Sequence, residues 1–199
     1  MAPEARREQI VNAAVHTTAR LGIANTRHSH VAAEAEIAIP TVFRYLPSRR
    51  DLVDAVLQTV AGYLVNMVEE AAATAADTHG KLLAVVNAFA RTIDDDADYI
   101  RIFLDWGASI SEETWPSYVV FQDRILDRLE SIVIHGQECG DVPAGVNAWW
   151  AAHLIMGSGN IIAQMKFRER SADEIAGFLE ALVHGALSPS RPAGKARSE

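Results

Sequence analysis

The sequence holds a single cysteine, Cys139, and has no uninterrupted apolar run of membrane-spanning length. One cysteine excludes an internal disulfide and is typical of a reducing compartment. The first twenty residues mix acids with arginines and lack the apolar core of a secretory signal. The most apolar stretch, residues 144–165, is interrupted by His153 and by the glycine and polar residues at 157–160, which favours a buried helix. We therefore expect a cytoplasmic protein without a membrane role.

Patterns typical of β-strands, metal sites and covalent catalysis are also missing. There is no sustained period-two alternation, whereas alanine is abundant and apolar residues recur at helical spacing, which predicts an all-α protein. The acidic run at 94–98 lacks the alternating acids and closing glutamate of a calcium loop. His28 and His30 have no third ligand near them in the sequence, and no nucleophile-elbow motif is present. We expect no metal, no cofactor and no enzymatic activity.

Charge is divided unevenly along the chain. The net charge is −8, but residues 1–52 hold seven arginines and five acids, a net of +2, so the remainder carries −10. A basic front end on an acidic protein indicates a polyanionic partner for that end. The positive charge is densest in "IAIPTVFRYLPSRRDLV", residues 37–53, which has three arginines and no acid before Asp51.

Cap and breaker residues divide the first fifty residues into three helices. The first helix is expected to end at Gly22, a typical C-terminal signal. The second is short, with Thr26 or Ser29 as its N-cap. The third begins at Pro40, which needs no N–H at a helix start, and is ended by Pro47.

A capping-box pair, Ser48 and Asp51, predicts the start of a long fourth helix that runs toward Ala76. Five further helices, nine in all, are expected at 81–94, 97–109, 114–138, 144–167 and 172–187. We expect a domain boundary after residue 52, with one helical domain at 1–52 and a second, larger one at 53–188. The tail at 189–199 has nothing to bury and is expected to be disordered.

The second and third helices have the form of a helix-turn-helix unit, in which the second helix of the pair lies in the major groove of DNA. Val42, Phe43 and Leu46 are expected to face inward. Arg44 then faces the groove, where a guanidinium suits guanine O6 and N7. The other candidates on this helix are Ile39 and Pro40 for a thymine methyl, Thr41 for a base edge or phosphate, and Tyr45 for a phosphate.

Flanking residues complete the predicted DNA surface. Arg49 and Arg50, at the N-terminus of the fourth helix, suit phosphates on one side of the groove, and Thr26, Arg27 and His28 suit phosphates on the other. A solvated arginine face is the usual explanation of such a run, but its placement in the helix-turn-helix unit, on and just after the proline-bounded third helix, favours DNA.

Aromatic side chains gather in the middle of the chain, with a few polar residues among them. The candidate ligand-binding residues are Phe89, Phe103, Trp106, Trp115, Tyr118, Phe121, Gln122, Trp150, His153 and Asn160. Apolar walls with a few polar groups are typical of a small-molecule pocket, and equally of a core with satisfied polar residues. Cations are confined to the helix ends here, which favours a largely uncharged, aromatic ligand.

Two patches carry a family resemblance. The stretch 22–56, above all "TVFRYLPSRRDLVDAVL", resembles the most diagnostic motif of the TetR family of transcriptional regulators. The second patch, "LDWGASISEETWP" at 104–116, is similar to the corresponding segment of the vibrio quorum-sensing master regulators, the LuxR, HapR and SmcR group. The resemblance implies a helix-turn-helix domain followed by a larger domain that senses a small molecule.

The sequence departs from the family pattern at several positions in the helix-turn-helix unit. Glu36 stands where family members usually have glycine in the turn, and Ala38 stands where they have an N-capping serine. Arg44 and Pro40 replace the asparagine and the small residue of the vibrio group, which implies a different operator sequence. The basic N-terminal arm is reduced to two arginines.

The resemblance further implies a homodimer held by the last two long helices. Both are apolar over more than one stripe and contain glycines that allow close approach. The candidate dimerisation residues are Trp149, Met156, Gly157, Ile161, Phe178, Leu182 and Gly185. Burial within the monomer's own core is the alternative for these helices.

The resulting hypothesis is a homodimeric regulator that binds a palindromic double-stranded DNA operator and acts as a repressor released by a small, largely apolar effector. One alternative is a helical small-molecule-binding adaptor with a degenerate DNA head. Others are a quorum-sensing-type global regulator with activating as well as repressing roles, and an enzyme that uses the aromatic pocket.

Overall fold

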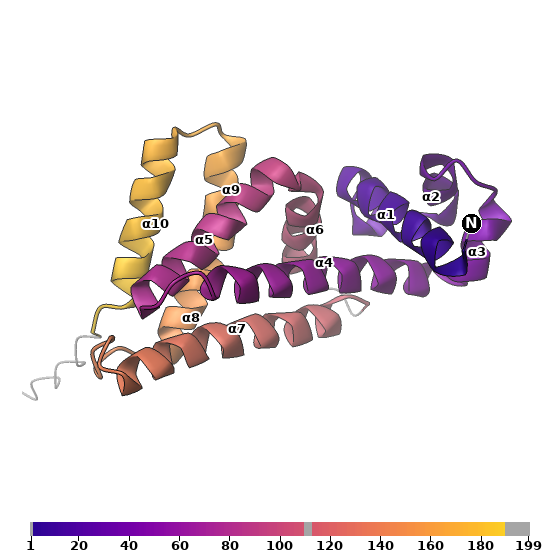
Figure 1. Ribbon diagram of the computed structural model, residues 1–199. Helices are drawn as coiled ribbons and strands as arrows, with labels where there is room; N and C mark the ends of the chain where they lie inside the picture. Colours follow the sequence, from indigo (N-terminus) through magenta and orange to yellow (C-terminus); the bar gives the residue numbers. More distant parts are fainter. Residues whose placement is uncertain (1, 110–112, 190–199) are drawn as a thin grey trace, which may run out of the picture. The chain divides into compact units, whose positions relative to one another are not determined.

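The computed structural model describes residues 2–109 and 113–189, and these form helices joined by short connections (Figure 1). Their bounds are α1 Pro3–Leu21, a 3-10 helix η1 Ile23–Asn25, α2 His28–Glu34, α3 Ile39–Tyr45, α4 Arg49–Ala72, α5 Thr78–Asp95, α6 Ala97–Ala108, α7 Trp115–Glu138, α8 Ala148–Gly157, α9 Gly159–Phe167 and α10 Ala172–Ala186. The all-α prediction is confirmed. The predicted disordered tail lies outside the described residues from position 190 onward.

The chain divides into two compact units. The first comprises residues up to 68 together with 89–123, and the second comprises 69–88 together with the residues from 124 onward. Helices α4, α5 and α7 contribute to both. The predicted domain boundary after residue 52 does not coincide with a boundary of these units, and the predicted domains stay predictions.

In the first unit, α1 packs against α2, α3 and α6. Ile10, Ala14, Val31 and Val42 are fully buried there and supply the core beneath the two short helices. Helix α1 ends where expected, because Gly22 adopts a φ of 81° and its N–H donates to the carbonyl of Thr18 at 2.8 Å. A left-handed φ of this kind is adopted readily by glycine.

The second unit is built around α10, which packs against α8 and α9 (Figure 1). Ser171 and Glu174 form a capping box at the start of α10. Gly136 on α7 leaves room for Thr78 and Val142, because a Cβ at position 136 would collide with both side chains. Thr78 is held in turn by Asp141, whose carboxylate accepts from the Thr78 N–H at 2.5 Å.

The structure corrects three details of the predicted helices. The helix expected at 144–167 begins at 148 and is divided at Ser158 into α8 and α9, although hydrogen bonds continue through the break from Ile162 N–H to the Ser158 carbonyl. Helix α4 ends at Ala72 rather than near Ala76. The N-cap of α2 is Arg27, with no side-chain cap bond. Thr26 does not cap because its hydroxyl donates to the carbonyl of Gly22.

Among the described residues, no helix is both long and apolar enough to cross a membrane. The same part of the chain contains no group of three or more His, Cys, Asp and Glu side chains that could hold a metal ion.

Candidate nucleic-acid interface

The turn between α2 and α3 has the hydrogen bonds of a Schellman motif. The N–H of Ile37 donates to the carbonyl of Ala32 at 3.0 Å, and the N–H of Glu36 donates to Ala33 at 3.2 Å. This geometry places Glu36 at φ +54°, the left-handed region that glycine usually occupies. Gln9 on α1 fastens the turn, since its Nε2 donates to the carbonyl of Ala35 at 3.0 Å.

Helix α3 is held from below by two buried residues and a histidine. Val42 and Leu46 are buried, as predicted. The Nε2 of His28 donates to the carbonyl of Leu46 at 2.8 Å, and the imidazole stacks on the ring of Phe43 at 4.0 Å. Phe43 is 46% exposed, so its predicted inward orientation is wrong. Val42 and Leu46, four residues apart, already fill the buried line, and the Phe43 ring covers His28 instead.

The outer surface of α3 combines apolar and cationic side chains. Pro40, Arg44 and Ile39 are exposed, and Thr41 and Tyr45 are half-buried. Within the described residues, no other group forms a hydrogen bond or ion pair with the Arg44 side chain, so its guanidinium is available to a partner outside the chain. Pro40 supplies the first-turn position at which a missing N–H costs nothing. These residues share one continuous exposed face.

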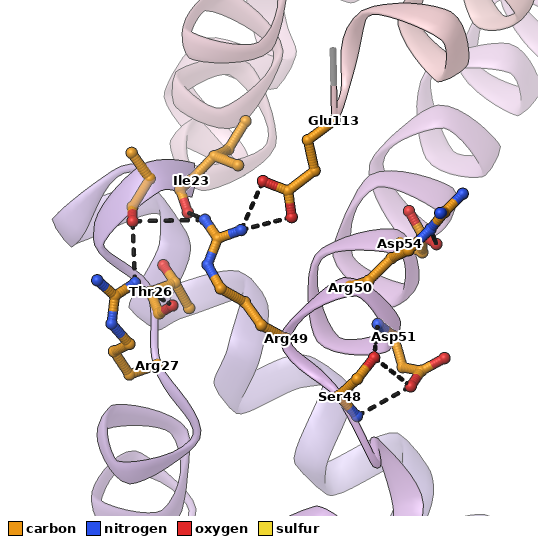
Figure 2. Close-up of polar contacts among 10 residues, drawn as sticks. Ile23, Thr26, Arg27, Ser48, Arg49, Arg50, Asp51, Asp54 and Glu113 are labelled. Carbon is orange, nitrogen blue, oxygen red and sulfur yellow. Dashed lines mark hydrogen bonds and ion pairs between the residues drawn. The ribbon is translucent and has the colours of Figure 1, made fainter. Parts of the chain in front are cut away.

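The start of α4 is capped as the sequence predicts. The Ser48 hydroxyl donates to the Asp51 carboxylate at 2.6 Å, and the Asp51 N–H donates back to the Ser48 hydroxyl at 3.1 Å (Figure 2). These hydrogen bonds from Ser48 lower the pKa of Asp51 below its usual value. Arg50, with a side chain 81% exposed, makes a long ion pair of 3.6 Å with Asp54.

Arg49 is held much more firmly than its neighbour. Its Nη1 donates to both carboxylate oxygens of Glu113, at 2.5 and 2.6 Å, and its Nη2 donates to the carbonyl of Ile23 at 3.1 Å (Figure 2). A longer contact of 3.4 Å joins Nη2 to the carbonyl of Ala24. Arg49 therefore connects the start of α4 to η1 and to Glu113, two residues before the start of α7.

Of the residues predicted to contact phosphate at the start of α2, two are buried and hydrogen-bonded within the protein, and one is exposed. Thr26 is fully buried, and its hydroxyl donates to Gly22 at 2.9 Å. His28 is buried and donates to Leu46. Arg27 is exposed and contacts only the backbone carbonyls of Ala24 and Thr26, so it can turn toward an anion.

Six of the predicted ligand-binding aromatics form one group in the first unit. Trp106 stacks on Phe121 with ring centroids 5.4 Å apart, Tyr118 meets both rings edge-on or tilted, and Phe103 contacts Phe121. The outer members are Phe89, against Phe103, and Trp115, against Tyr118. Trp106 is buried, and its Nε1 donates to the carbonyl of Thr114 at 3.0 Å.

Tyr118 is the partly buried polar member of this aromatic group. Burial raises the pKa of its hydroxyl. The hydroxyl lies against Gly107, where a Cβ would come within 2.9 Å of it. The aromatic group thus contains a polar atom close to a position that tolerates no side chain.

The remaining ligand candidates lie elsewhere. Gln122 belongs to the first unit, whereas Trp150, His153 and Asn160 belong to the second. Trp150 is 53% exposed, and His153 stacks on Trp149 at 3.6 Å. These ligand assignments stay predictions.

The dimerisation candidates lie on the second unit, largely at its surface. Trp149, Gly157, Ile161 and Gly185 are exposed, and the remaining three, Met156, Phe178 and Leu182, are half-buried. Trp150, Leu154 and Phe167, which were not predicted for dimerisation, add exposed apolar surface on α8 and α9.

Two contacts that involve acids of the first unit had no signal in the sequence. Asp105 on α6 accepts from the N–H of Ile23 at 2.8 Å, and Asp98 pairs with His16 on α1 at 2.7 Å. Together with Glu113 they join α6 and the connection that precedes α7 to α1, η1 and α4. These partners lie 64 to 82 residues apart, and short-range spacing cannot reveal such pairs.

No protein-family model matches the chain. The sequence is 26% identical over 183 residues to the HTH-type transcriptional regulator LuxR of Vibrio harveyi, covering 92% of this chain and 89% of LuxR. The resemblance predicted from the two sequence patches is confirmed.

Solved structures share the fold. FadR from Bacillus subtilis, determined in complex with stearoyl-CoA, superposes with a TM-score of 0.77 at 19% identity, covering 92% of this chain and 99% of FadR. A TetR-like transcriptional regulator from Rhodococcus sp. RHA1 gives a TM-score of 0.75 at 18% identity, covering 94% of this chain and 98% of that one.

Proposed function

We propose that the chain is a TetR-type transcriptional regulator that binds a palindromic operator as a homodimer and represses transcription until a small, largely apolar ligand releases it. The family acts on transcription and is not enzymatic, which sets aside the enzyme alternative. TetR regulators bind DNA, and the proposal concerns how this chain does so.

The observation that carries the proposal is the exposed face of α3. The Arg44 side chain has no hydrogen-bond or ion-pair partner among the described residues, while the buried Val42 and Leu46 hold the helix beneath it. A free guanidinium on a rigid helix suits bidentate hydrogen bonding to guanine. Ile39 and Pro40 on the same face suit a thymine methyl.

Phosphate contacts would flank this face. Arg50 and Arg27 are exposed, Tyr45 and Thr41 are half-buried, and the N-terminus of α4 favours an anion. Thr26 and His28 support the interface indirectly in this proposal, because their polar atoms are committed to Gly22 and Leu46.

A second copy of the chain is the proposed partner of α8 and α9. Trp149, Trp150, Leu154 and Ile161 are each more than half exposed, a concentration of apolar surface that supports burial in an interface. A homodimer would present two copies of α3 to half-sites about one helical turn apart.

The proposed effector binds beside the aromatic group of the first unit. The similarity to FadR, which binds stearoyl-CoA, supports a ligand with a large apolar part. The Tyr118 hydroxyl offers that ligand a polar contact.

The test is selection of duplexes from a random library by the purified protein, with its mass measured in solution. We expect an inverted repeat bound by two chains, with affinity that falls as salt is raised, and lower transcription from a promoter that overlaps the site. A chain that is monomeric at micromolar concentration, or that binds no duplex, contradicts the proposal.

The specific observation in favour of an adaptor with a degenerate DNA head is the strained turn. Glu36 occupies a left-handed conformation, and Ala38 provides no side-chain cap for α3. An adaptor of this kind would bind a small molecule but select no duplex in the same experiment.

A further inference from the structure

The guanidinium of Arg49 is bound to a carboxylate of the protein itself, whereas an arginine that binds a DNA phosphate needs free N–H groups. Both of its terminal nitrogens are used, Nη1 by the Glu113 carboxylate and Nη2 by the carbonyls of Ile23 and Ala24 (Figure 2). A carboxylate oxygen that accepts a charge-assisted hydrogen bond from a guanidinium N–H takes the place that a phosphate oxygen would take. The adjacent Arg50 has only the long ion pair with Asp54.

We infer that the Glu113 carboxylate occupies the place of a DNA phosphate on Arg49 in the free protein, so that operator binding must exchange one anion for the other. The inference rests on the proposed DNA-binding function and deepens it by naming its regulation. Glu113 is thus an internal competitor of DNA for a single arginine.

The pair is exposed enough to exchange. The Arg49 side chain is 33% exposed and that of Glu113 is 42% exposed, so solvent and an incoming phosphate can reach both. Partly exposed ion pairs contribute little to stability. Replacing Glu113 by a DNA phosphate on Arg49 therefore costs little binding free energy. The backbone contacts of Arg49 with η1 do not depend on Glu113, so the arginine stays near its position when the carboxylate leaves.

The position of Glu113 is fixed by the aromatic group. The next residue, Thr114, is buried, and its carbonyl accepts from the Nε1 of Trp106. Trp106 stacks on Phe121 and meets Tyr118 edge-on. An effector that packs on the half-buried Tyr118, and through its contact with Trp106 holds Thr114 in place, would favour Glu113 on Arg49 and lower DNA affinity. By linkage, DNA would weaken the binding of that effector equally.

The test compares operator affinity of the wild-type chain and Glu113→Gln over a salt series from about 50 to about 200 mM. We expect Glu113→Gln to bind roughly threefold more tightly at the low-salt end, the factor that matches a modest ion pair. The advantage should shrink as salt rises, because screening weakens the hold of Glu113 on Arg49. Asp123→Asn is the matched control, since it removes one exposed acid of the same unit and should leave affinity unchanged.

A double-mutant cycle separates this exchange from a general charge effect. In an Arg49→Gln background, Glu113→Gln should no longer change DNA affinity. An equal gain in that background, an equal gain in Asp123→Asn, or no gain in Glu113→Gln alone overturns the inference. Circular dichroism and urea unfolding of each variant confirm that the compared chains are folded.

Trp106→Phe tests the connection to the aromatic group. Removal of the hydrogen bond to Thr114 should raise DNA affinity in the same direction as Glu113→Gln, and the combined variant should gain no more than either alone. Additive gains overturn the connection.

Failure of the wild-type chain to bind any duplex overturns the proposed function itself. If the wild-type chain binds DNA and Glu113→Gln binds with the same affinity, only the exchange on Arg49 is overturned.

Discussion

The imidazole of His28 lies almost parallel to the ring of Phe43, with the planes 6° apart and the centroids 4.0 Å apart. The Nε2 of His28 also donates to the carbonyl of Leu46, so one side chain at the start of α2 fixes both the outer ring and the C-terminal end of α3.

Substitution of His28 by alanine should therefore loosen α3. Loss of a buried hydrogen bond and of a ring stack should lower the free energy of unfolding by about 2 kcal/mol. Urea unfolding followed by circular dichroism measures the change. His30→Ala is the control, since His30 is exposed on the same helix and its removal should change stability by less than about 0.5 kcal/mol. Equal losses in both variants would contradict the anchoring role.

Arg44→Ala and Arg50→Ala should weaken DNA binding in different ways. Loss of Arg44 should cost about 1–3 kcal/mol on the preferred operator and relax the preference at one base pair of each half-site. Loss of Arg50 should weaken binding to all duplexes alike and reduce the slope of log affinity against log salt by about 1. Competition binding with single-base operator variants distinguishes the two. An unchanged base preference in Arg44→Ala would show that another residue reads the base.

Glu36→Gly should stabilise the protein, because glycine adopts the left-handed backbone conformation of this position without steric strain. The same φ of 54° occurs at Glu169, at the end of α9 in the second unit, so Glu169→Gly is a matched control. Each substitution should raise the free energy of unfolding by about 1 kcal/mol. Only Glu36→Gly should also increase DNA affinity, because it removes an acid from the turn between α2 and α3. A gain in affinity with Glu169→Gly would refute this distinction.

Thr17→Val should be neutral or stabilising. Thr17 is fully buried, and its hydroxyl has no hydrogen-bond partner among the described residues, so its removal relieves a desolvation penalty of about 1 kcal/mol. Thr26→Val is the contrasting variant, since that hydroxyl donates to Gly22 and its loss should destabilise by about 1 kcal/mol. Thermal unfolding of both variants tests the pair, and a destabilised Thr17→Val would indicate an unrecognised partner.

Asp51 should make stability depend on pH in the acidic range. Its pKa in the folded chain is lowered by the Ser48 hydrogen bonds, from an ordinary value of 3.8. A lowered folded pKa gives stability that is present above the unfolded pKa and is lost as pH falls through the folded one. Asp51→Asn should therefore be less stable than the wild type at pH near 7, and this difference should shrink below the ordinary carboxylate range. Urea unfolding at neutral and acidic pH measures it, and a constant difference would exclude this linkage.

Local chemistry is what the sequence predicted well. Gly22, Pro40 and the pair Ser48 and Asp51 each determine a helix boundary through contacts within four residues, so their spacing is visible in the chain. The apolar line of Val42 and Leu46 follows the helical period in the same way.

Long-range polar contacts are what the sequence did not predict. The sequence predicts that Arg49 contacts phosphate, and that role stays a prediction. Its ion pair with Glu113 is not visible in the sequence, because Glu113 lies 64 residues away in a connection without periodicity. The sequence also predicts a phosphate contact for His28. Its burial is not visible there, because it depends on Phe43 and Leu46, in and just after another helix. The break at Ser158 was missed because apolar spacing continues through it and the hydrogen bonds are preserved on both sides.

The four tryptophans lie at very different depths, which gives the protein two optical signals. Trp106 is 1% exposed among other rings, whereas Trp149 and Trp150 are each 53% exposed. A soluble quencher of indole fluorescence therefore lowers the emission of Trp149 and Trp150 on α8 and leaves the emission of Trp106 unquenched. Occupancy of the aromatic group and coverage of α8 can thus be followed separately in one unlabelled sample.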